Sequence, residues 1–392
     1  MYNIKCDKTY KMNLNMPELS LRYSKIINSD KKNVAYIKDV FDNSTFRYRA
    51  YNVIQTMNSS DKYTVSAFLV REIYLLYDII DKLDIVIFQR AKWSFEVEDF
   101  ITVLKEKNKI VIYDMDDMIY NTSYVPDYLN SIGDYKEFTI DSFFSLSKRY
   151  ELIINLCDGV IVTTEPLKNK IKNDLKKPVW ILNNYLNQEQ IKASELVIKQ
   201  KKKYKDNSKF VIGYFSGSNS HKRDLEVAES GLVKLMNKYN NVYLKIVGFM
   251  NLSDEMKELK EQGRIVFSKF VSYEELQYEI GKVDLNIIPL QKHEFNSCKS
   301  ELKYFEASIV NTLTLATDNE IYSKIIKDNI DGFLTNEIEW FEKLEYIYLN
   351  YFKLDNIISN ACLKCHKLYD YDKQIDKIET IYDNIIQELG EK

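Results

Sequence analysis

A short segment in the second half of the chain places basic and acidic side chains at helical spacing. Residues 285–317, LNIIPLQKHEFNSCKSELKYFEASIVNTLTLAT, predict a strand, a polar loop, a helix beginning at about Ser300 and a second strand. Ser300 is the expected N-cap, and free amides in the first turn of a helix attract anions such as a diphosphate. Glu306 is placed to accept hydrogen bonds from sugar hydroxyls. The expected anion site comprises Lys299, Ser300, Glu301, Leu302, Lys303 and Glu306. An exposed, charged helix face is the alternative.

A second candidate anion site follows the strand predicted at FVIGYFSG (210–217). Gly217 allows a close turn of the backbone, and the amide and hydroxyl of Ser218 are potential donors to an anion. Lys222 or Arg223 would neutralise the anion, and an amphipathic helix is expected to begin near Asp224. An ordinary loop with solvated charges explains this pattern equally well.

Charged side chains also follow strands predicted in the first half of the chain. Arg47 and Arg49 come after the first strand and open a helix, so they are suited to hold a phosphate or an acidic sugar, although a pair of surface charges has the same pattern. Arg90 ends a strand, and an aspartate from the next strand would bind hydroxyls or orient an arginine. The expected first-half site comprises Arg47, Arg49, Arg90, Asp114, Asp116 and Asp117.

Twelve short apolar runs rich in β-branched residues alternate with longer amphipathic stretches. The runs are 34–39, 64–70, 85–90, 109–115, 159–164, 179–184, 210–217, 242–248, 265–270, 285–290, 312–317 and 332–335. Strands that are apolar throughout and alternate with helices predict parallel sheets covered on both faces. We therefore expect an α/β protein with two Rossmann-like, doubly wound domains facing a cleft and a C-terminal helical tail.

The expected domain boundaries follow from the charged, polar stretch IKASELVIKQKKKYKDNSK, which lacks strand character. The expected parts are a first domain (1–190), a linker (191–209), a second domain (210–365) and a C-terminal helix (366–392) that returns to the first domain. Because parallel sheets bind ligands at the carboxyl ends of their strands, both candidate sites should face the cleft.

Composition excludes several classes of protein. The formal net charge of −3 lacks the basic excess typical of nucleic-acid binding, so no nucleic-acid partner is expected. The N-terminus does not resemble a signal peptide, no apolar run approaches the roughly 18 residues of a membrane span, and five scattered cysteines fit a reducing compartment. A cytoplasmic location is therefore expected, with KQKKKYK (199–205) a solvated linker or a contact to anionic lipid at the inner face of the membrane.

The second half resembles the C-terminal domain of the retaining GT-B glycosyltransferases of glycosyltransferase family 4. The similarity is carried by CKSELKYFEASIVNTLTLATDNEIYSKIIKDNIDGFL and IGYFSGSNSHKRD, and in the first half by FRYRAYN, FQRAKW, IVIYDMDDMIY and VIVTTEPL. Of the two glutamates that the family spaces as E-x7-E, Glu306 matches the second, which contacts the donor ribose. Cys298 stands where the first is expected, a departure for which Glu294, Asn296 or Lys299 would have to compensate.

The resemblance implies transfer of a sugar from a UDP- or GDP-sugar with retention of configuration and without a cofactor or metal. The donor diphosphate would be held by a basic pair, one member from Lys222 or Arg223 and the other from Lys299 or Lys303, and the catalytic residues would be Glu306, Lys303 and Lys299. The first-half site would bind the acceptor, which is a glycan, a lipid-linked oligosaccharide or a protein.

Two alternatives stay open at this point, and a third is disfavoured. Asp114 and Asp116 form an Asp-x-Asp pair of the kind that holds Mn²⁺ or Mg²⁺ in metal-dependent glycosyltransferases. Cys298 keeps open a non-catalytic GT-B-like binding subunit. A nucleotide-binding dehydrogenase is disfavoured because no strand is followed by G-x-G-x-x-G. The haem-like spacing of Cys362, Cys365 and His366 is given little weight, because haem attachment of that kind occurs in exported proteins.

Overall fold

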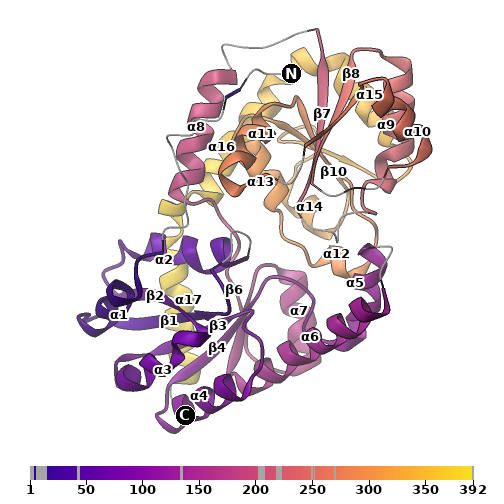
Figure 1. The fold of residues 1–392 in the computed structure, drawn as a ribbon. Helices are drawn as coiled ribbons and strands as arrows, with labels where there is room; N and C mark the ends of the chain where they lie inside the picture. The colour runs from indigo at the N-terminus through magenta and orange to yellow at the C-terminus, as the bar shows by residue number, and fades with distance from the viewer. Residues whose placement is uncertain are drawn as a thin grey trace.

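A computed structural model of the chain describes residues 4–5, 16–41, 45–132, 136–201, 208–217, 223–248, 250, 252–268 and 271–390. These residues form two α/β halves, each built on a parallel six-stranded sheet (Figure 1). All twelve strands expected from the sequence are present, so the predicted fold class is confirmed. The described helices include none that is both long and apolar enough to cross a bilayer.

The first sheet has the strand order β2-β1-β3-β4-β5-β6. Its strands are β1 (Lys32–Lys38), β2 (Tyr63–Leu69), β3 (Ile85–Gln89), β4 (Ile110–Met115), β5 (Gly159–Val162) and β6 (Val179–Ile181). The α-helices of this half are α1 (Leu19–Ile27), α2 (Asn52–Met57), α3 (Ile73–Leu76), α4 (Phe95–Glu106), α5 (Val125–Ile132), α6 (Glu137–Leu156) and α7 (Glu165–Leu175). A π-helical turn, η1 (Arg47–Tyr51), leads directly into α2, and 3-10 turns lie at η2 (Val70–Glu72), η3 (Tyr77–Lys82) and η4 (Thr122–Tyr124).

The second sheet has the order β12-β11-β10-β7-β8-β9. Its strands are β7 (Phe210–Ser216), β8 (Val242–Gly248), β9 (Ile265–Ser268), β10 (Leu285–Ile288), β11 (Leu313–Thr317) and β12 (Phe333–Thr335). Its helices are α9 (Glu226–Lys238), α10 (Asp254–Glu261), α11 (Tyr273–Gly281), α12 (Glu294–Ser297), α13 (Leu302–Ser308), α14 (Glu320–Ile325) and α15 (Trp340–Asn350). Strands of both sheets are buried along most of their length, as strands covered on both faces must be.

The expected linker (191–209) begins in a helix, α8 (Gln188–Lys201), so residues 199–201 of the stretch expected to be solvated (199–205) are helical, and residues 202–205 lie outside the described residues. One face of α8 packs on α11, with Ala193 and Val197 fully buried. The ammonium group of Lys201 donates to the carbonyl of Asn311 (2.7 Å) and to the hydroxyl of Thr312 (2.8 Å). Lys201 is therefore buried rather than solvated, because its position on the buried face of α8 brings its ammonium group to these acceptors.

The C-terminal segment crosses back from the second half to the first (Figure 1). Helix α16 (Asp355–Tyr369) follows the turn η6 (Tyr351–Lys353) and packs on α13, and η7 (Tyr371–Lys373) leads into α17 (Ile375–Leu389). Tyr382 of α17 lies 5.2 Å from the ring of Tyr63 on β2, and its hydroxyl lies 3.1 Å from that of Tyr36 on β1. The other crossing, between β6 and α8, runs beside it: the amide of Leu186 donates to the carbonyl of Tyr369 at 2.8 Å.

Candidate functional site

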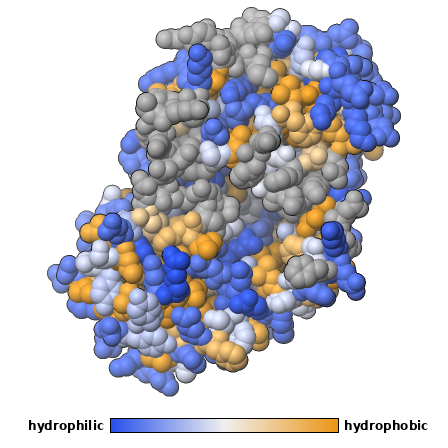
Figure 2. All heavy atoms as spheres, in the orientation of Figure 1, coloured by the Kyte–Doolittle hydropathy of each residue, from blue (hydrophilic) through white to orange (hydrophobic). Residues whose placement is uncertain are grey.

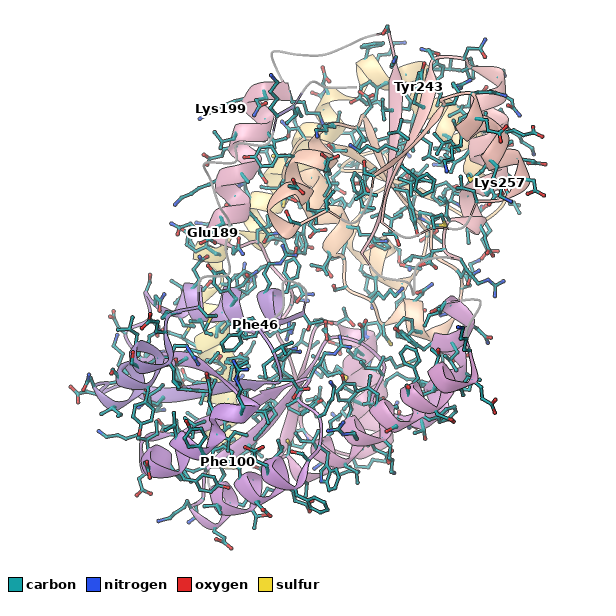
Figure 3. The ribbon with its side chains drawn as sticks, viewed as in Figure 1. Phe46, Phe100, Glu189, Lys199, Tyr243 and Lys257 are labelled. Carbon is teal, nitrogen blue, oxygen red and sulfur yellow. The ribbon has the colours of Figure 1, made fainter. Side chains whose placement is uncertain are left out.

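The candidate residues of the two halves meet where the carboxyl edge of the first sheet faces α12 and α13. Side-chain hydrogen bonds join the halves there: Thr164 Oγ1 donates to the Cys298 carbonyl (3.0 Å), Asn184 Nδ2 to Ser300 Oγ (3.0 Å), and Tyr48 to the carboxylate of Glu306. Phe46, immediately before η1, lies on the side of the first half that faces the second (Figure 3). Hydrophilic side chains interleave with smaller hydrophobic areas on the face shown in Figure 2.

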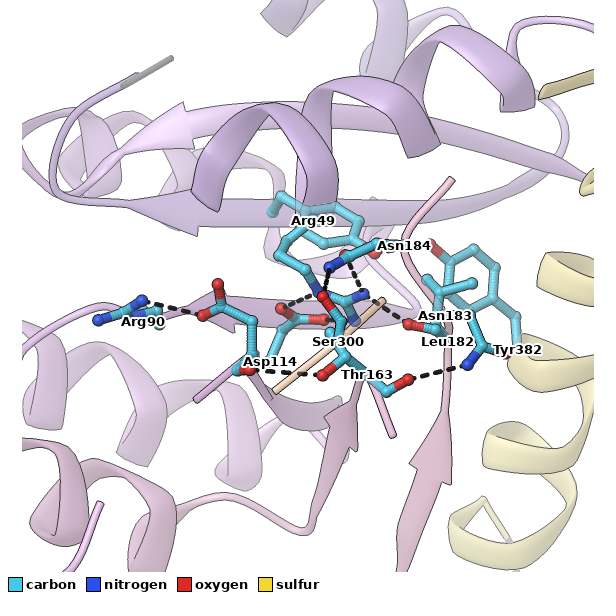
Figure 4. Close-up of polar contacts among 11 residues, drawn as sticks. Arg49, Arg90, Asp114, Thr163, Leu182, Asn183, Asn184, Ser300 and Tyr382 are labelled. Carbon is cyan, nitrogen blue, oxygen red and sulfur yellow. Dashed lines mark hydrogen bonds and ion pairs between the residues drawn. The ribbon is translucent and has the colours of Figure 1, made fainter. Parts of the chain in front are cut away.

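Arg49 and Asp114 form a closed ion pair inside the first half (Figure 4). Nε and Nη2 of Arg49 donate to the two carboxylate oxygens of Asp114 at 2.9 and 2.7 Å, and Nη1 donates to the carbonyl of Leu182 (2.5 Å) and to Asn184 Oδ1 (3.1 Å). Both charged side chains are 0% exposed. The acceptor contact expected for Arg49 and Asp114 is therefore wrong, because neither group is open to a ligand; the aspartate instead orients the arginine.

Arg90, Asp116 and Asp117 form an open cluster at the same edge. Nη1 of Arg90 lies 3.0 Å from Asp116 Oδ1 and 3.5 Å from Asp117 Oδ2, and the three side chains are 18%, 15% and 33% exposed. Arg90 has a φ of +44°, a left-handed conformation that is uncommon for a residue other than glycine. Burial and the neighbouring Asp116 raise the pKa of Asp117. This cluster, with the Arg47 side chain beside α13, is what remains of the expected acceptor site.

Asp114 and Asp116, the two expected ligands of the alternative metal site, are both engaged by arginines in this arrangement. Asp114 is engaged on both oxygens by Arg49, and Asp116 is engaged by Arg90. Within the described ranges, no three His, Cys, Asp or Glu side chains are grouped so as to hold a metal ion. An Asp114–Asp116 metal site would require breaking the buried ion pair.

Glu306 is held by residues of the opposite half. Tyr48 donates its hydroxyl hydrogen to Glu306 Oε1, and Arg47 Nη2 lies 3.9 Å from the same oxygen. Oε2 of Glu306 has no hydrogen-bond partner in the described part of the chain, and it is not sealed from solvent. Burial raises the pKa of Glu306, whereas Arg47, the Tyr48 hydroxyl and Lys303 act in the opposite direction. One oxygen of the carboxylate thus remains without a hydrogen-bond partner among the described residues.

Lys303 lies one turn before Glu306 on α13. Its ammonium nitrogen is buried and has no hydrogen-bond acceptor among the described residues, and it lies 5.3 Å from the centre of the Tyr214 ring. Burial lowers the pKa of Lys303 to about 8. A buried ammonium without an acceptor is costly, so an anionic ligand at this point would relieve the cost.

Lys299 is paired, in contrast to Lys303. Its ammonium lies 3.7 Å from Asp224 Oδ2 and 5.0 Å from the centre of the Phe295 ring. Burial lowers its pKa, and Asp224 and Asp117 oppose that shift. Asp224, which is 1% exposed, also accepts from Asn296 Nδ2 at 2.9 Å. Sequence reasoning did not single out Asp224 as a site residue, because a helix-start aspartate is common and its partners lie some 70 residues away.

The start of α13 differs from the prediction. The helix begins at Leu302 with Glu301 as its N-cap, and the cap makes no side-chain hydrogen bond. Ser300 is therefore not the N-cap; its hydroxyl instead accepts from Asn184 across the two halves (Figure 4). Glu301 is 4% exposed and accepts a hydrogen bond from Tyr369 (3.1 Å), so its side chain belongs to the packing of α16 on α13.

Cys298, at the position where the first glutamate was expected from the resemblance, is buried against the first half. Its Sγ lies 3.8 Å from Met118 Sδ. The side chain is 3% exposed, and burial raises its pKa to about 12. Of the residues expected to compensate, Glu294 forms an ion pair with Lys170 (2.8 Å) and stays 61% exposed, whereas Asn296 is buried and bound to Asp224.

The loop after β7 is only partly described. No atom of a described residue lies within 4 Å of the position that a Cβ of Gly217 would take. Ser218 and Lys222 lie outside the described residues. Arg223 is exposed; it pairs with Glu226 (3.3 Å) and approaches the carbonyl of Asn130 in the first half (3.4 Å).

Solved structures share this two-half architecture at low sequence identity. HepE from Anabaena in complex with UDP is 13% identical, with a TM-score of 0.58 over 90% of this chain and 100% of its own. A glycosyltransferase from Rickettsia africae ESF-5 is 14% identical, with a TM-score of 0.62 over 91% of this chain and 99% of its own. WaaG, a glycosyltransferase involved in lipopolysaccharide biosynthesis, is 12% identical, with a TM-score of 0.59 over 88% of this chain and 98% of its own.

These likenesses establish the fold. No family model matches the sequence, and no curated protein matches it. The chain has two Rossmann-like halves and two chain crossings that lie beside one another, as expected from the sequence. Each alignment also covers nearly all of this chain and nearly all of the matched protein. The chain therefore has the GT-B fold.

Proposed function

We propose that this protein is a glycosyltransferase that moves a sugar from a nucleotide sugar bound by its second half to an acceptor bound by its first. The observation that carries the proposal is the pair of side chains on α13. Lys303 offers a buried ammonium without an acceptor among the described residues, and Glu306, one turn on, keeps Oε2 for a ligand. At that spacing the ammonium group suits the diphosphate of a nucleotide sugar. The carboxylate oxygen suits a hydroxyl group of its ribose or its sugar.

The donor site of this proposal comprises Lys303, Lys299 and Glu306. Gly217, Ser218, Lys222 and Arg223 are proposed to border the phosphates there. Solved structures of HepE contain UDP and UDP-glucose, which favours a uridine donor over a guanosine donor for a chain of the same fold. The proposed division of the chain is a first domain (1–190), a connecting segment (191–209), a second domain (210–365) and a C-terminal segment (366–392) that holds the end of α16 and the whole of α17.

The proposed chemistry is transfer with retention of configuration. Lys303 and Lys299 stabilise the negative charge that grows on the leaving diphosphate, and burial strengthens that effect because few waters screen it. The leaving phosphate oxygen takes the proton of the attacking acceptor hydroxyl, so no protein nucleophile is needed. The two lysines supply the positive charge that a metal ion would otherwise provide.

The acceptor is proposed to lie over Arg90, Asp116 and Asp117, with Arg47 nearby. One guanidinium and two carboxylates leave this cluster without the excess positive charge that a phosphate or an acidic sugar would require. Carboxylates accept hydrogen bonds from hydroxyls, so a glycan acceptor, free, lipid-linked or protein-linked, fits the cluster.

The test is nucleotide binding followed by turnover. Purified protein would be titrated with UDP, GDP, CMP and dTDP by calorimetry, and then incubated with the corresponding sugars, with and without EDTA, while released nucleotide is measured. Loss of a hydrogen bond to a charged group costs roughly 1.5–3 kcal/mol, so Lys303→Met should weaken nucleotide binding by about 10–100-fold. Lys324→Met, an exposed lysine on α14, is the matched control and should bind as the wild type does. Absence of binding by every nucleotide would reject the proposal.

A non-catalytic GT-B-like subunit is the second candidate, favoured by the burial of Cys298 where the family has a glutamate. Such a subunit would bind a nucleotide and release none from any nucleotide sugar, even with glycan acceptors present. Release that depends on Glu306 would exclude it.

A further inference from the structure

We infer that Tyr48 is a positioning residue of the donor site: it holds Oε1 of Glu306 and so leaves Oε2 as the oxygen that meets the ligand. The inference rests on the role proposed above for Glu306. It adds a residue from the first half to a site that is otherwise built by the second. Tyr48 does not itself touch the donor in this inference; it acts through the carboxylate.

The contact between the two side chains is buried and directional. Tyr48 is 5% exposed and Glu306 is 7% exposed, and the phenol donates to Oε1 across the boundary between the halves. The guanidinium of Arg47 lies 4.2 Å from the centre of the Tyr48 ring and approaches the same oxygen. Both first-half groups therefore act on one oxygen of the carboxylate.

A chain of buried amides fixes the direction of the Tyr48 hydrogen. Gln190 Nε2 donates to the Tyr48 hydroxyl oxygen at 3.0 Å, so the phenol hydrogen remains for Glu306. The orientation of the Gln190 amide is set in turn, because its Oε1 accepts from the backbone amide of Asn187 (3.1 Å). Asn187 Nδ2 donates to Asn52 Oδ1 (3.1 Å). All three amide residues are fully buried, so a reversed arrangement would leave polar groups unpaired.

The π-helical turn η1 points the side chains of Tyr48 and Arg49 in different directions. The amide of Asn52 donates to the carbonyl of Arg47 five residues earlier, which widens the turn. Arg49 points into the first half and is bound to Asp114, whereas Tyr48 and Arg47 face α13. The buried ion pair thus anchors the backbone that carries the phenol. Turns of this kind are frequent at functional sites.

Among the described residues, the ionisable side chains that interact with Glu306 include Arg47, Tyr48, Lys303 and Tyr322. Arg47, the Tyr48 hydroxyl and Lys303 lower the pKa of Glu306 against the effect of burial. Burial and nearby acidic groups, Glu306 among them, raise the pKa of Tyr322 well above its ordinary value, so that phenol stays neutral. Removing the Tyr48 hydroxyl takes away one of the lowering effects, so the pKa of Glu306 rises. As the pH falls, the Glu306 carboxylate is then protonated at a higher pH than in the wild type, and any activity that needs the ionised carboxylate is lost at that higher pH.

The experiment compares Tyr48→Phe with Tyr185→Phe. Tyr185 is the matched control because its buried hydroxyl also bonds within the first half, to Thr56 at 3.1 Å, without touching Glu306. Affinity for UDP and GDP would be measured by calorimetry from pH 5 to 9, together with kcat/KM for the preferred nucleotide sugar. In Tyr48→Phe the acid limb of both profiles should move to higher pH by about one unit. The reason is that a hydrogen bond to a carboxylate is worth roughly 1.5 kcal/mol, and about 1.4 kcal/mol corresponds to one pKa unit. In Tyr185→Phe the limb should not move.

A second variant guards against misfolding of the first. Gln190→Met removes the donor that orients the phenol and should move the acid limb in the same direction by a smaller amount. The inference alone is overturned if Glu306→Gln abolishes function while both Tyr48→Phe and Gln190→Met keep the acid limb of the wild type. If the wild type neither binds nor turns over any nucleotide, the proposed function fails, and the inference fails with it.

Discussion

The buried pair of Arg49 and Asp114 gives the sharpest prediction for stability. Arg49→Met removes the guanidinium but keeps most of the volume of the side chain. It leaves the Asp114 carboxylate buried at 0% exposure without its two hydrogen bonds, and it strips the Leu182 carbonyl of its donor. Removing one partner of a buried ion pair costs about 3–5 kcal/mol.

That cost converts to a measurable change of unfolding temperature. About 1 kcal/mol corresponds to roughly 2–4 °C for a domain of 150–250 residues, so Arg49→Met should lower the unfolding temperature by about 6–20 °C. The assay is thermal unfolding followed by circular dichroism at constant protein concentration. Arg49→Met combined with Asp114→Leu should recover a large part of the loss, because it removes the stranded charge as well.

The outcome also separates a structural role from a ligand contact. Arg49→Lys loses the bidentate geometry, so it too should lower the unfolding temperature. If Arg49 instead met an acceptor, Arg49→Met would unfold at the wild-type temperature and raise only the KM for the acceptor. A shift of less than about 1 °C for Arg49→Met would refute the reasoning from burial, since about 6 °C is the smallest loss expected.

Three further predictions concern single residues. Because the pKa of Lys303 is about 8 and a bound diphosphate raises it, UDP binding at pH 8 should take up about half a proton; calorimetry in buffers of different ionisation enthalpy measures this, and Lys303→Met should abolish it. Cys298→Glu should not raise nucleotide release and should lower the unfolding temperature, because the side chain is buried against Met118; a stable, more active variant would contradict the packing. Lys201→Met should lower the unfolding temperature by several degrees, because the carbonyl of Asn311 and the hydroxyl of Thr312 lose their donor. An unchanged unfolding temperature would show that Lys201 is solvated instead.

The sequence by itself determined the fold, because its signals are local. Each strand is a continuous apolar run, and each helix between strands repeats its apolar residues at helical spacing, so element types follow from neighbours a few residues apart. The same locality brought Lys303 and Glu306 together, since residues three apart on a helix share a face. The sequence also indicated that polar residues at strand ends meet at the carboxyl edge of a parallel sheet.

Only the tertiary structure decided which of those polar residues is open to a ligand. Arg49 and Asp114 are 65 residues apart and look like exposed charges in the sequence, yet they neutralise one another in the core. Tyr48 and Glu306 are separated by 258 residues, and Cys298 packs on a methionine 180 residues away. Pairing over such separations depends on how the two sheets and the crossing helices are placed, and on which side chains are desolvated there. Neither the spacing nor the type of a residue carries that information.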